Sequence, residues 1–247
     1  MAAQPEPEIV LYDLASTKNI CFSPAVWRIR LMLNYKQIPY RTIFLEFPDI
    51  EPTLKGLGIP PSPSPSGPAY IVPAIHHMPT NTHLMDSTPI ALFLESTYPA
   101  PPLTPPSGHD LAIQSRARAA VGPAFRTSIT PRELRILSPR SQEYFRRTRE
   151  AALGVQRLEE LLEPPGKEEE VWRGVEGAMR EVGEMMRTSK AEGPFVLGER
   201  PCQTDFWIAG ALQAARVVDE GVWRRVVAFP GFAEVYGACE GWMGKMD

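Results

Sequence analysis

Proline is distributed unevenly along the chain, and this distribution constrains the fold more than any other sequence feature. Of the 27 prolines, 19 lie at or before Pro106. Because proline lacks a backbone N–H and fixes φ, it favours turns, loops and strand ends over helix interiors. We therefore expect the front of the chain to combine strands, loops and short helices, and the remainder to be mostly helical. A length of 247 residues suits two such domains.

The boundary between the two parts is predicted in the segment APPLTPPSGHD, residues 100–110. Clusters of proline and serine of this kind mark linkers between regular elements. We predict an α/β domain over residues 8–100, a linker over 101–107 and an all-helical domain over 108–247.

The front domain shows alternating strand and helix patterns. The predicted strands cover residues 8–14, 41–47, 70–76 and 83–85, and the predicted helices cover 24–35, 50–57 and 87–98. The apolar positions of helix 24–35 indicate one buried face, with Arg28 and Arg30 among its basic residues. Residues 59–69 are too rich in Pro and Ser for a regular element and are expected to form a loop. The order β-α-β-α-β-β-α implies a parallel strand pair joined by a right-handed crossover.

The back half is helical by its hydrophobic pattern. The predicted helices cover residues 110–127, 141–162, 168–188, 203–218 and 231–243. The mixed charges of residues 167–190 are typical of a solvated helix face.

Composition and charge exclude several functions. The formal net charge of −3 argues against a nucleic-acid-binding protein, which would carry clustered basic residues. The three cysteines, Cys21, Cys202 and Cys239, are too few and too widely spaced for a disulfide framework or a paired-cysteine zinc site. No apolar run is long enough to span a membrane, and the first residues lack the pattern of a signal peptide. We therefore expect a cytoplasmic protein with reduced thiols and no membrane partner.

The segment CFSPAVWRIRL, residues 21–31, places Ser23 and Pro24 at the start of a predicted helix. Serine suits the cap and proline the first helical position. A helix N-terminus favours an anion, and a hydroxyl there could donate a hydrogen bond to a thiolate and lower its pKa. Taken alone, the pattern also fits a serine that only caps its own helix.

Two further features lie later in the front domain. Val72-Pro73 interrupts an apolar run; a cis bond there could leave the backbone of Val72 free to pair with a peptide-like ligand, although an ordinary edge-strand proline is the alternative. Asp86-Ser87 opens a predicted helix and could hold the charged groups of an amino-acid end, or could simply cap that helix.

The order and spacing of these three features resemble the glutathione transferase superfamily. The run SPAVWRIR (23–30) is similar to versions in its zeta class and in its lignin β-etherase-like group. The resemblance also covers LYDL, VPAI and MDSTPIALFLESTYP, which begin at residues 11, 72 and 85. It implies a thioredoxin-like N-terminal domain followed by the all-helical C-terminal domain of that family.

The resemblance also implies roles for the site residues. The Ser23 hydroxyl would activate the glutathione thiol, and Val72, next to a cis Pro73, would pair with the cysteinyl backbone. Asp86 and Ser87 would hold the γ-glutamyl end. Glutathione would be the co-substrate, and a hydrophobic, aromatic or xenobiotic small-molecule electrophile would dock between the domains. The resemblance further makes a homodimer the expected assembly.

The C-terminal domain shows one departure from the family pattern. GPFVLG and PCQTD, which begin at residues 193 and 201, resemble the segment that starts a buried helix with a capping box. Cys202 stands where Ser or Thr is usual, and Thr204 where Ala is usual, while Asp205 matches. Because cysteine caps poorly, the helix start is expected to lose about 1 kcal/mol.

Two other functions remain open from the sequence. The chain could be a non-catalytic ligand- or partner-binding module of the same family, or a glutathione-dependent thiol reductase that uses Cys21. Cys21 lies two residues before Ser23, a displacement that favours a partly buried, non-catalytic thiol. His76, His77 and His83 are more typical of polar surface than of a metal site, so no metal is expected.

Overall fold

The front part of the protein is built on a four-stranded mixed sheet. The computed structural model describes residues 6–63 and 67–244. The strands are β1 (Ile9–Leu14), β2 (Tyr40–Leu45), β3 (Ala74–His77) and β4 (Thr82–Met85). Their order across the sheet is β2-β1-β3-β4. β1 and β2 are parallel, with Ile9 opposite Tyr40, and β3 runs antiparallel to both β1 and β4.

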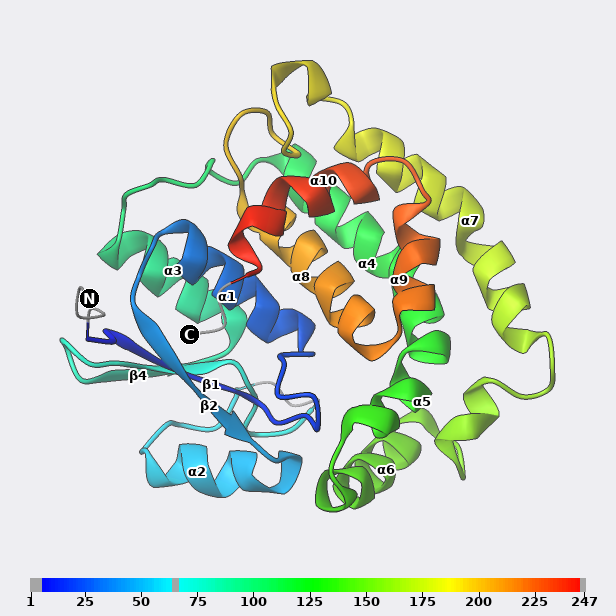
Figure 1. Cartoon of the computed structure of the whole chain (residues 1–247), viewed down its shortest axis with the longest axis horizontal. Helices are drawn as coiled ribbons and strands as arrows, with labels where there is room; N and C mark the ends of the chain where they lie inside the picture. Colours follow the sequence, from blue (N-terminus) through cyan, green and yellow to red (C-terminus); the bar gives the residue numbers. More distant parts are fainter. Residues whose placement is uncertain (1–5, 64–66, 245–247) are drawn as a thin grey trace.

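Helices cover both faces of this sheet. α1 (Pro24–Tyr35) and α3 (Ser87–Thr97) lie on one side, and α2 (Ile50–Gly56) lies on the other (Figure 1). A 3-10 turn, η1 (Phe47–Asp49), leads into α2. The predicted element order and the thioredoxin-like architecture are confirmed.

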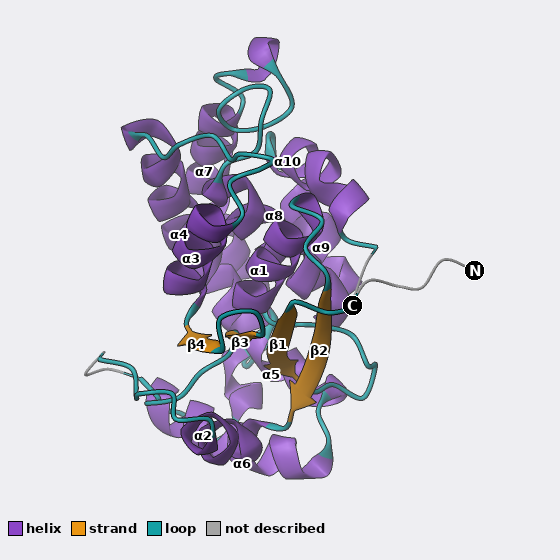
Figure 2. Cartoon of the chain, turned by 90° about the vertical axis from the view of Figure 1, so that its left-hand side faces the viewer, coloured by secondary structure: helices purple, strands orange, loops and turns teal. Residues whose placement is uncertain are grey.

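The remainder of the described chain is helical, as Figure 2 shows by colour. Its α-helices are α4 (Gly108–Ser128), α5 (Thr130–Glu133), α6 (Pro139–Leu153), α7 (Lys167–Met186), α8 (Gln203–Val218), α9 (Glu220–Val227) and α10 (Phe232–Cys239). Its 3-10 turns are η2 (Leu134–Ile136), η3 (Leu158–Leu161), η4 (Lys190–Glu192) and η5 (Glu240–Trp242). This part matches the predicted all-helical fold.

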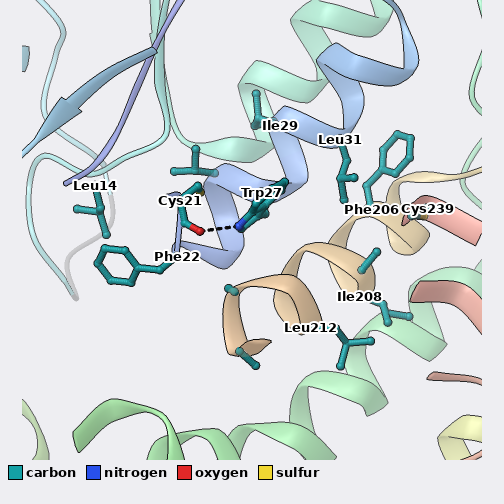
Figure 3. Packing of buried hydrophobic residues seen from close by; sticks show 14 of the residues in the cluster. Leu14, Cys21, Phe22, Trp27, Ile29, Leu31, Phe206, Ile208, Leu212 and Cys239 are labelled. Carbon is teal, nitrogen blue, oxygen red and sulfur yellow. Dashed lines mark hydrogen bonds between the residues drawn. The ribbon is translucent and has the colours of Figure 1, made fainter. Parts of the chain in front are cut away.

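Helix α1 joins the two parts of the molecule. It lies between the sheet and α8, against which it packs closely. Every residue from Val26 to Leu33 is buried, including Arg28 and Arg30, so the prediction of one buried face is wrong. Figure 3 shows apolar side chains of α1 and α8, among them Leu31 and Phe206, in this shared core.

Several predicted boundaries are corrected. β3 begins at Ala74 rather than Tyr70, because Pro73 has no N–H to contribute to the sheet. The helix predicted to end at Leu162 ends at Leu153, where Gly154 adopts a left-handed φ of 67° and stops it. The helix predicted over 231–243 ends at Cys239 and continues as the 3-10 turn η5.

Two helices and one strand end were not predicted. α9 is an eight-residue helix capped by Asp219, whose Oδ1 accepts from the Val222 N–H at 3.1 Å. α5 is a single turn that begins directly before Pro131. β2 ends at Leu45, and Phe47 starts η1 instead. These elements are too short to show a full hydrophobic period in the sequence.

The predicted loop over residues 59–69 is irregular where it is described, while residues 64–66 lie outside the described part. Among the described residues, no helix combines the length and apolar character needed to cross a membrane.

Candidate functional site

A cavity of about 470 Å³ opens between the front domain and α6. Its front wall includes Leu14 at the end of β1, Ser23 before α1, and Val72 before β3. Its back wall includes Tyr144 and Arg149 of α6. A volume of this size is typical of small-molecule sites.

Ser23 caps α1 and also lines the cavity. Its extended backbone (φ −85°, ψ 120°) lets the hydroxyl oxygen accept from the Val26 N–H at 3.4 Å. Among the described residues, the hydroxyl hydrogen has no acceptor, so it is available to a group in the cavity. Both interpretations of Ser23, cap and candidate donor, are therefore compatible with one geometry.

The loop before Ser23 is held by the first turns of α1. The Trp27 indole Nε1–H donates to the Cys21 carbonyl oxygen at 2.8 Å, marked by the dashed line in Figure 3. Both residues are buried. This hydrogen bond fixes the backbone two residues before the Ser23 hydroxyl.

A buried ion pair lies behind this loop. Arg30 donates to Asp13 Oδ2 at 2.9 Å, and both side chains are completely buried. The Cys21 thiol lies close to the same pair and is itself fully buried. Burial, and then the charge of Asp13, raise the pKa of the Cys21 thiol well above its ordinary value. Such a thiol is a poor nucleophile.

Val72 presents an unused peptide group at the cavity. The Val72-Pro73 bond is cis, as the resemblance implies. Neither the N–H nor the C=O of Val72 has a hydrogen-bond partner among the described residues, and the residue is only half-buried. An extended peptide could therefore pair with this backbone.

The start of α3 lies beside this segment. The Asp86 N–H donates to the Pro73 carbonyl oxygen at 3.0 Å. Asp86 has a φ of 78°, which is strained for a residue with a side chain. Its carboxylate accepts from the Thr88 N–H at 3.3 Å, which makes it the cap of α3, and Ser87 follows at the first helical position.

Arg28 is a component of this region that the sequence did not reveal. Its side chain extends from α1 to Gln203 Oε1, at 3.1 Å from Nη2, and its Nη1 lies 3.5 Å from the hydroxyls of Ser87 and Thr88. Burial lowers the pKa of Arg28, while the charge of Asp86 raises it. The guanidinium remains charged at neutral pH. The start of α3 therefore faces a buried cation.

One sequence signal could have indicated that role. Residues 28 and 30 lie about 200° apart around an α-helix, so both arginines cannot lie on one exposed face.

The structure brings Ser23 and Val72 to the same cavity, and places Asp86 and Ser87 next to them through the Asp86–Pro73 hydrogen bond.

At the start of α8, a carboxylate accepts from backbone N–H groups although the cap residue is not a serine. The Asp205 carboxylate accepts from the Cys202 N–H at 2.8 Å and from the Val196 N–H at 2.9 Å. The carboxylate half of the capping box is thus kept although Cys202 replaces the usual hydroxyl. No group of three or more potential metal ligands gathers among the described residues.

Comparisons with known proteins agree with this architecture. Family models for the glutathione S-transferase N-terminal and C-terminal domains match residues 22–97 and 110–242. The glutathione S-transferase-like protein ustS of Aspergillus flavus is 34% identical over 245 residues, covering 92% of this chain and 87% of that protein.

Solved structures are similar over nearly the whole chain. A glutathione S-transferase of Ceriporiopsis subvermispora in complex with glutathione has a TM-score of 0.85 and 29% identity, covering 97% of this chain and 99% of that one. Glutathione transferase GSTFuA3 of Phanerochaete chrysosporium has a TM-score of 0.82 and 29% identity, covering 99% of this chain and 100% of that one. The chain therefore belongs to the glutathione S-transferase family, as its two matched domains and its relatives show.

Proposed function

We propose that this protein binds glutathione, activates its thiol through Ser23 and transfers it to an aromatic or xenobiotic electrophile. The observation that carries the proposal is the Ser23 hydroxyl. It lines a cavity of about 470 Å³, and its hydrogen has no acceptor among the described residues. A thiolate placed there would receive this hydrogen bond together with the partial positive charge of the α1 N-terminus.

The backbone of Val72 is proposed to hold the cysteinyl part of glutathione. Its N–H and C=O have no partner in the described chain, and a peptide ligand supplies one acceptor and one donor for them. Because Ser23 and Val72 line the same cavity, this pairing would bring the cysteinyl thiol close to the Ser23 hydroxyl.

The γ-glutamyl end is proposed to lie at the start of α3. Its α-carboxylate would accept from the Ser87 hydroxyl and the helix N-terminus, with the buried Arg28 cation supplying the opposite charge. Its ammonium group would pair with the exposed Asp86 carboxylate. The residues present therefore fit each charged group of this end of glutathione.

The proposed reaction is a nucleophilic transfer. The glutathione thiol loses its proton to solvent, and the thiolate sulfur forms a bond to an electrophilic carbon of the second substrate. The leaving group departs with the electron pair of its former bond. Ser23 donates to the thiolate and does not itself lose a proton. The alternative that uses Cys21 is disfavoured by the complete burial of this thiol and its raised pKa.

A homodimer is proposed as the assembly. In the single chain, two large apolar side chains are strongly exposed to solvent: Leu92 of α3 at 69% and Leu111 of α4 at 54%. A second copy of the chain could cover them. Light scattering in solution would give twice the mass of the 27.5 kDa chain for a dimer. A mass equal to that of one chain would contradict this part of the proposal. A cytoplasmic location stays a prediction from the sequence.

The test of the proposed function combines binding and turnover. Wild type is expected to bind glutathione by calorimetry and to conjugate it to 1-chloro-2,4-dinitrobenzene. Ser23→Ala should lower kcat/KM by a factor of about 100 while glutathione affinity changes little, because a donor to the developing charge is removed. Cys21→Ala is the control and should keep the activity. Binding without turnover would indicate a non-catalytic module. Thiol–disulfide exchange that is lost in Cys21→Ser and spared in Ser23→Ala would indicate the thiol reductase.

A further inference from the structure

The back wall of the cavity differs in chemistry from the part that faces Ser23. It is formed by η1 and α6, which contact each other. Figure 2 shows α6 next to α2. The rings of Phe47 and Tyr144 are nearly parallel there, with centroids 6.2 Å apart and an interplanar angle of 12°. Both residues line the cavity, as does Tyr70 from the loop before β3. Flat aromatic walls favour a planar ring as the bound group.

Arg149 is the only cation among the described residues that line this cavity. In the described part of the chain its guanidinium forms no hydrogen bond and has no carboxylate within ion-pair distance; it lies over the Phe145 ring, 5.2 Å from the centroid. Two other arginines of α6 are paired with carboxylates: Arg146 with Glu159 at 2.6 Å, and Arg140 with Asp49 at 2.5 Å. The remaining one, Arg147, lies over the Tyr144 ring, 5.5 Å from the centroid, and does not line the cavity.

Two carboxylates lie near enough to affect the charge of this wall. Glu133 is close to Arg149, but burial raises the pKa of Glu133 to about 7 against the opposing charge of Arg149. Glu133 is therefore only partly ionised near pH 7, and it offsets the charge of the arginine only in part. Glu51 lines the α2 side of the cavity and is exposed to solvent, where its charge is screened.

The hydroxyl of Thr148, one residue before Arg149, is not available to donate to an anion. Thr148 also lines the cavity, and its hydroxyl donates to carbonyl oxygens of its own helix, at 2.9 Å to Tyr144 and 3.2 Å to Phe145. Its hydrogen is thus in use. Tyr70 and Tyr144 also bring phenolic hydroxyls that can donate to an anion, but among the described lining residues only the Arg149 guanidinium adds a positive charge and a fork that matches the geometry of a carboxylate.

We propose that the second-substrate site selects aromatic electrophiles that carry a negative charge, with Arg149 as the residue that determines this specificity. The proposal rests on the proposed transferase function, because it concerns the acceptor of the glutathione sulfur. The ring lies against the Phe47 and Tyr144 wall, and its carboxylate or phenolate oxygen accepts from the Arg149 guanidinium.

A matched pair of probes tests the selection. 4-Chloro-3,5-dinitrobenzoate and its methyl ester share the same ring and the same leaving group. In both, the glutathione sulfur forms a C–S bond at the ring carbon that bears chlorine, chloride leaves with the electron pair, and the thiol proton passes to solvent. Each kcat/KM is divided by the rate constant of the uncatalysed reaction with glutathione, so that the intrinsic reactivity of the ring cancels.

Wild type is expected to favour the carboxylate by about tenfold, because a hydrogen bond between charged groups is lost with the ester. Arg149→Met should bring the ratio close to one, mainly by lowering the value for the carboxylate, and Arg149→Lys should keep part of the preference. The matched control is Arg224→Met on α9, where the side chain is 71% exposed and outside the cavity. This control should leave the ratio unchanged.

Three results would overturn the proposal. The first is a ratio near one in wild type, and the second is a preference for the carboxylate that survives in Arg149→Met. The third is a rise in the glutathione KM of Arg149→Met with the ratio unchanged, which would assign Arg149 to the glycyl carboxylate of glutathione instead.

Failure of the transferase function is distinguished by a binding measurement. The unreactive 3,5-dinitrobenzoate and its methyl ester are titrated into wild type and Arg149→Met, followed by quenching of tryptophan fluorescence. Tighter binding of the carboxylate in wild type only would uphold anion selection even if neither chloro compound is turned over. Equal binding of the two compounds in wild type would contradict it regardless of catalysis.

Discussion

Behind the candidate site, the ion pair of Asp13 and Arg30 is the most completely buried pair of charges among those described, with both side chains fully enclosed. Arg30 also donates to the Thr42 hydroxyl of β2 at 2.9 Å, so the pair ties α1 to two strands. Removing one charge of such a pair leaves the other without compensation in a low-dielectric environment, whereas removing both does not.

Arg30→Met is therefore expected to lower the free energy of unfolding by about 3–5 kcal/mol, because Asp13 is left buried without its cation. The double variant Asp13→Leu with Arg30→Met should recover much of that loss. Urea unfolding of the two variants and wild type measures both values. A double variant less stable than Arg30→Met would contradict this account of the pair.

The carboxyl group of Glu133 gives a prediction for pH. Its pKa in the folded protein is about 7, above the ordinary value of 4.5. Folding therefore favours the protonated form, so its contribution to stability is fully present below about pH 4.5 and is lost as the pH rises through about 7.

Glu133→Gln keeps this side chain neutral at every pH. Its stability relative to wild type should rise between pH 5 and pH 8, by an amount on the order of 2 kcal/mol. Urea unfolding at a series of pH values measures the difference. A difference that stays constant over this range would show that Glu133 is ionised in the folded protein already at pH 5.

For single residues, the sequence predicted some features of the candidate site and missed others. Ser23-Pro24 and Asp86-Ser87 are local capping patterns, and they start helices where expected. The position of Arg28 depends on α8 and α3 packing around α1, a contact between segments far apart in the chain. No local pattern encodes that contact. The same holds for Arg149, whose place in the cavity depends on how α6 meets the front domain.

Among the elements, α1 and α8 pack closely against each other at Gly210. A Cβ atom at this position would lie 3.0 Å from the Arg28 backbone nitrogen and 3.2 Å from the Pro24 carbonyl oxygen. Both neighbours are backbone atoms of α1, which cannot move aside as a flexible side chain can. A glycine in the middle of α8 is thus favoured by packing and not by backbone conformation.

Gly210→Val should separate the two helices and lower the free energy of unfolding by about 2–3 kcal/mol. It should also weaken catalysis, since Pro24 directly follows Ser23. Gly177→Val on α7 is the matched control: a Cβ there meets nothing within 4 Å, so little change is expected. Thermal unfolding compares the two, and equal stabilities of both variants would contradict the packing argument.

Element boundaries followed the sequence where a strong local stop signal exists. α8 covers the predicted 203–218, between its capping box and Asp219. The predicted helix 141–162 extends past the end of α6 at Leu153, where Gly154 stops the helix, and α9 is not predicted because eight residues carry little periodic signal. The sequence thus predicted the bounds of α8, and it missed the end of α6 and the short helix α9.

For the whole molecule, the two family domains share one core. Trp27 and Leu31 of α1 belong to the same buried cluster as Phe206 of α8, so the front domain buries part of its apolar surface on the back domain (Figure 3). The end of the front domain at residue 100 and the start of the back domain at residue 108 stay predictions from the sequence. Two domains joined by such a surface are expected to unfold together.

Urea unfolding should therefore show a single transition. Helical circular dichroism reports mainly on the back domain, and an indole at Trp27 reports on the front domain; replacing the other four tryptophans, Trp172, Trp207, Trp223 and Trp242, by phenylalanine isolates that signal. The two curves are expected to coincide. Separate midpoints would show that the domains are energetically independent.

The most direct test of the central claim is the pKa of glutathione bound to the protein, measured by difference ultraviolet absorbance of the thiolate in wild type and Ser23→Ala. We predict that wild type lowers the thiol pKa by about two units, equivalent to about 2.7 kcal/mol, and that Ser23→Ala restores a value near that of free glutathione. A bound thiol with an unshifted pKa in wild type, or a lowered pKa that persists in Ser23→Ala, would contradict the role assigned to Ser23.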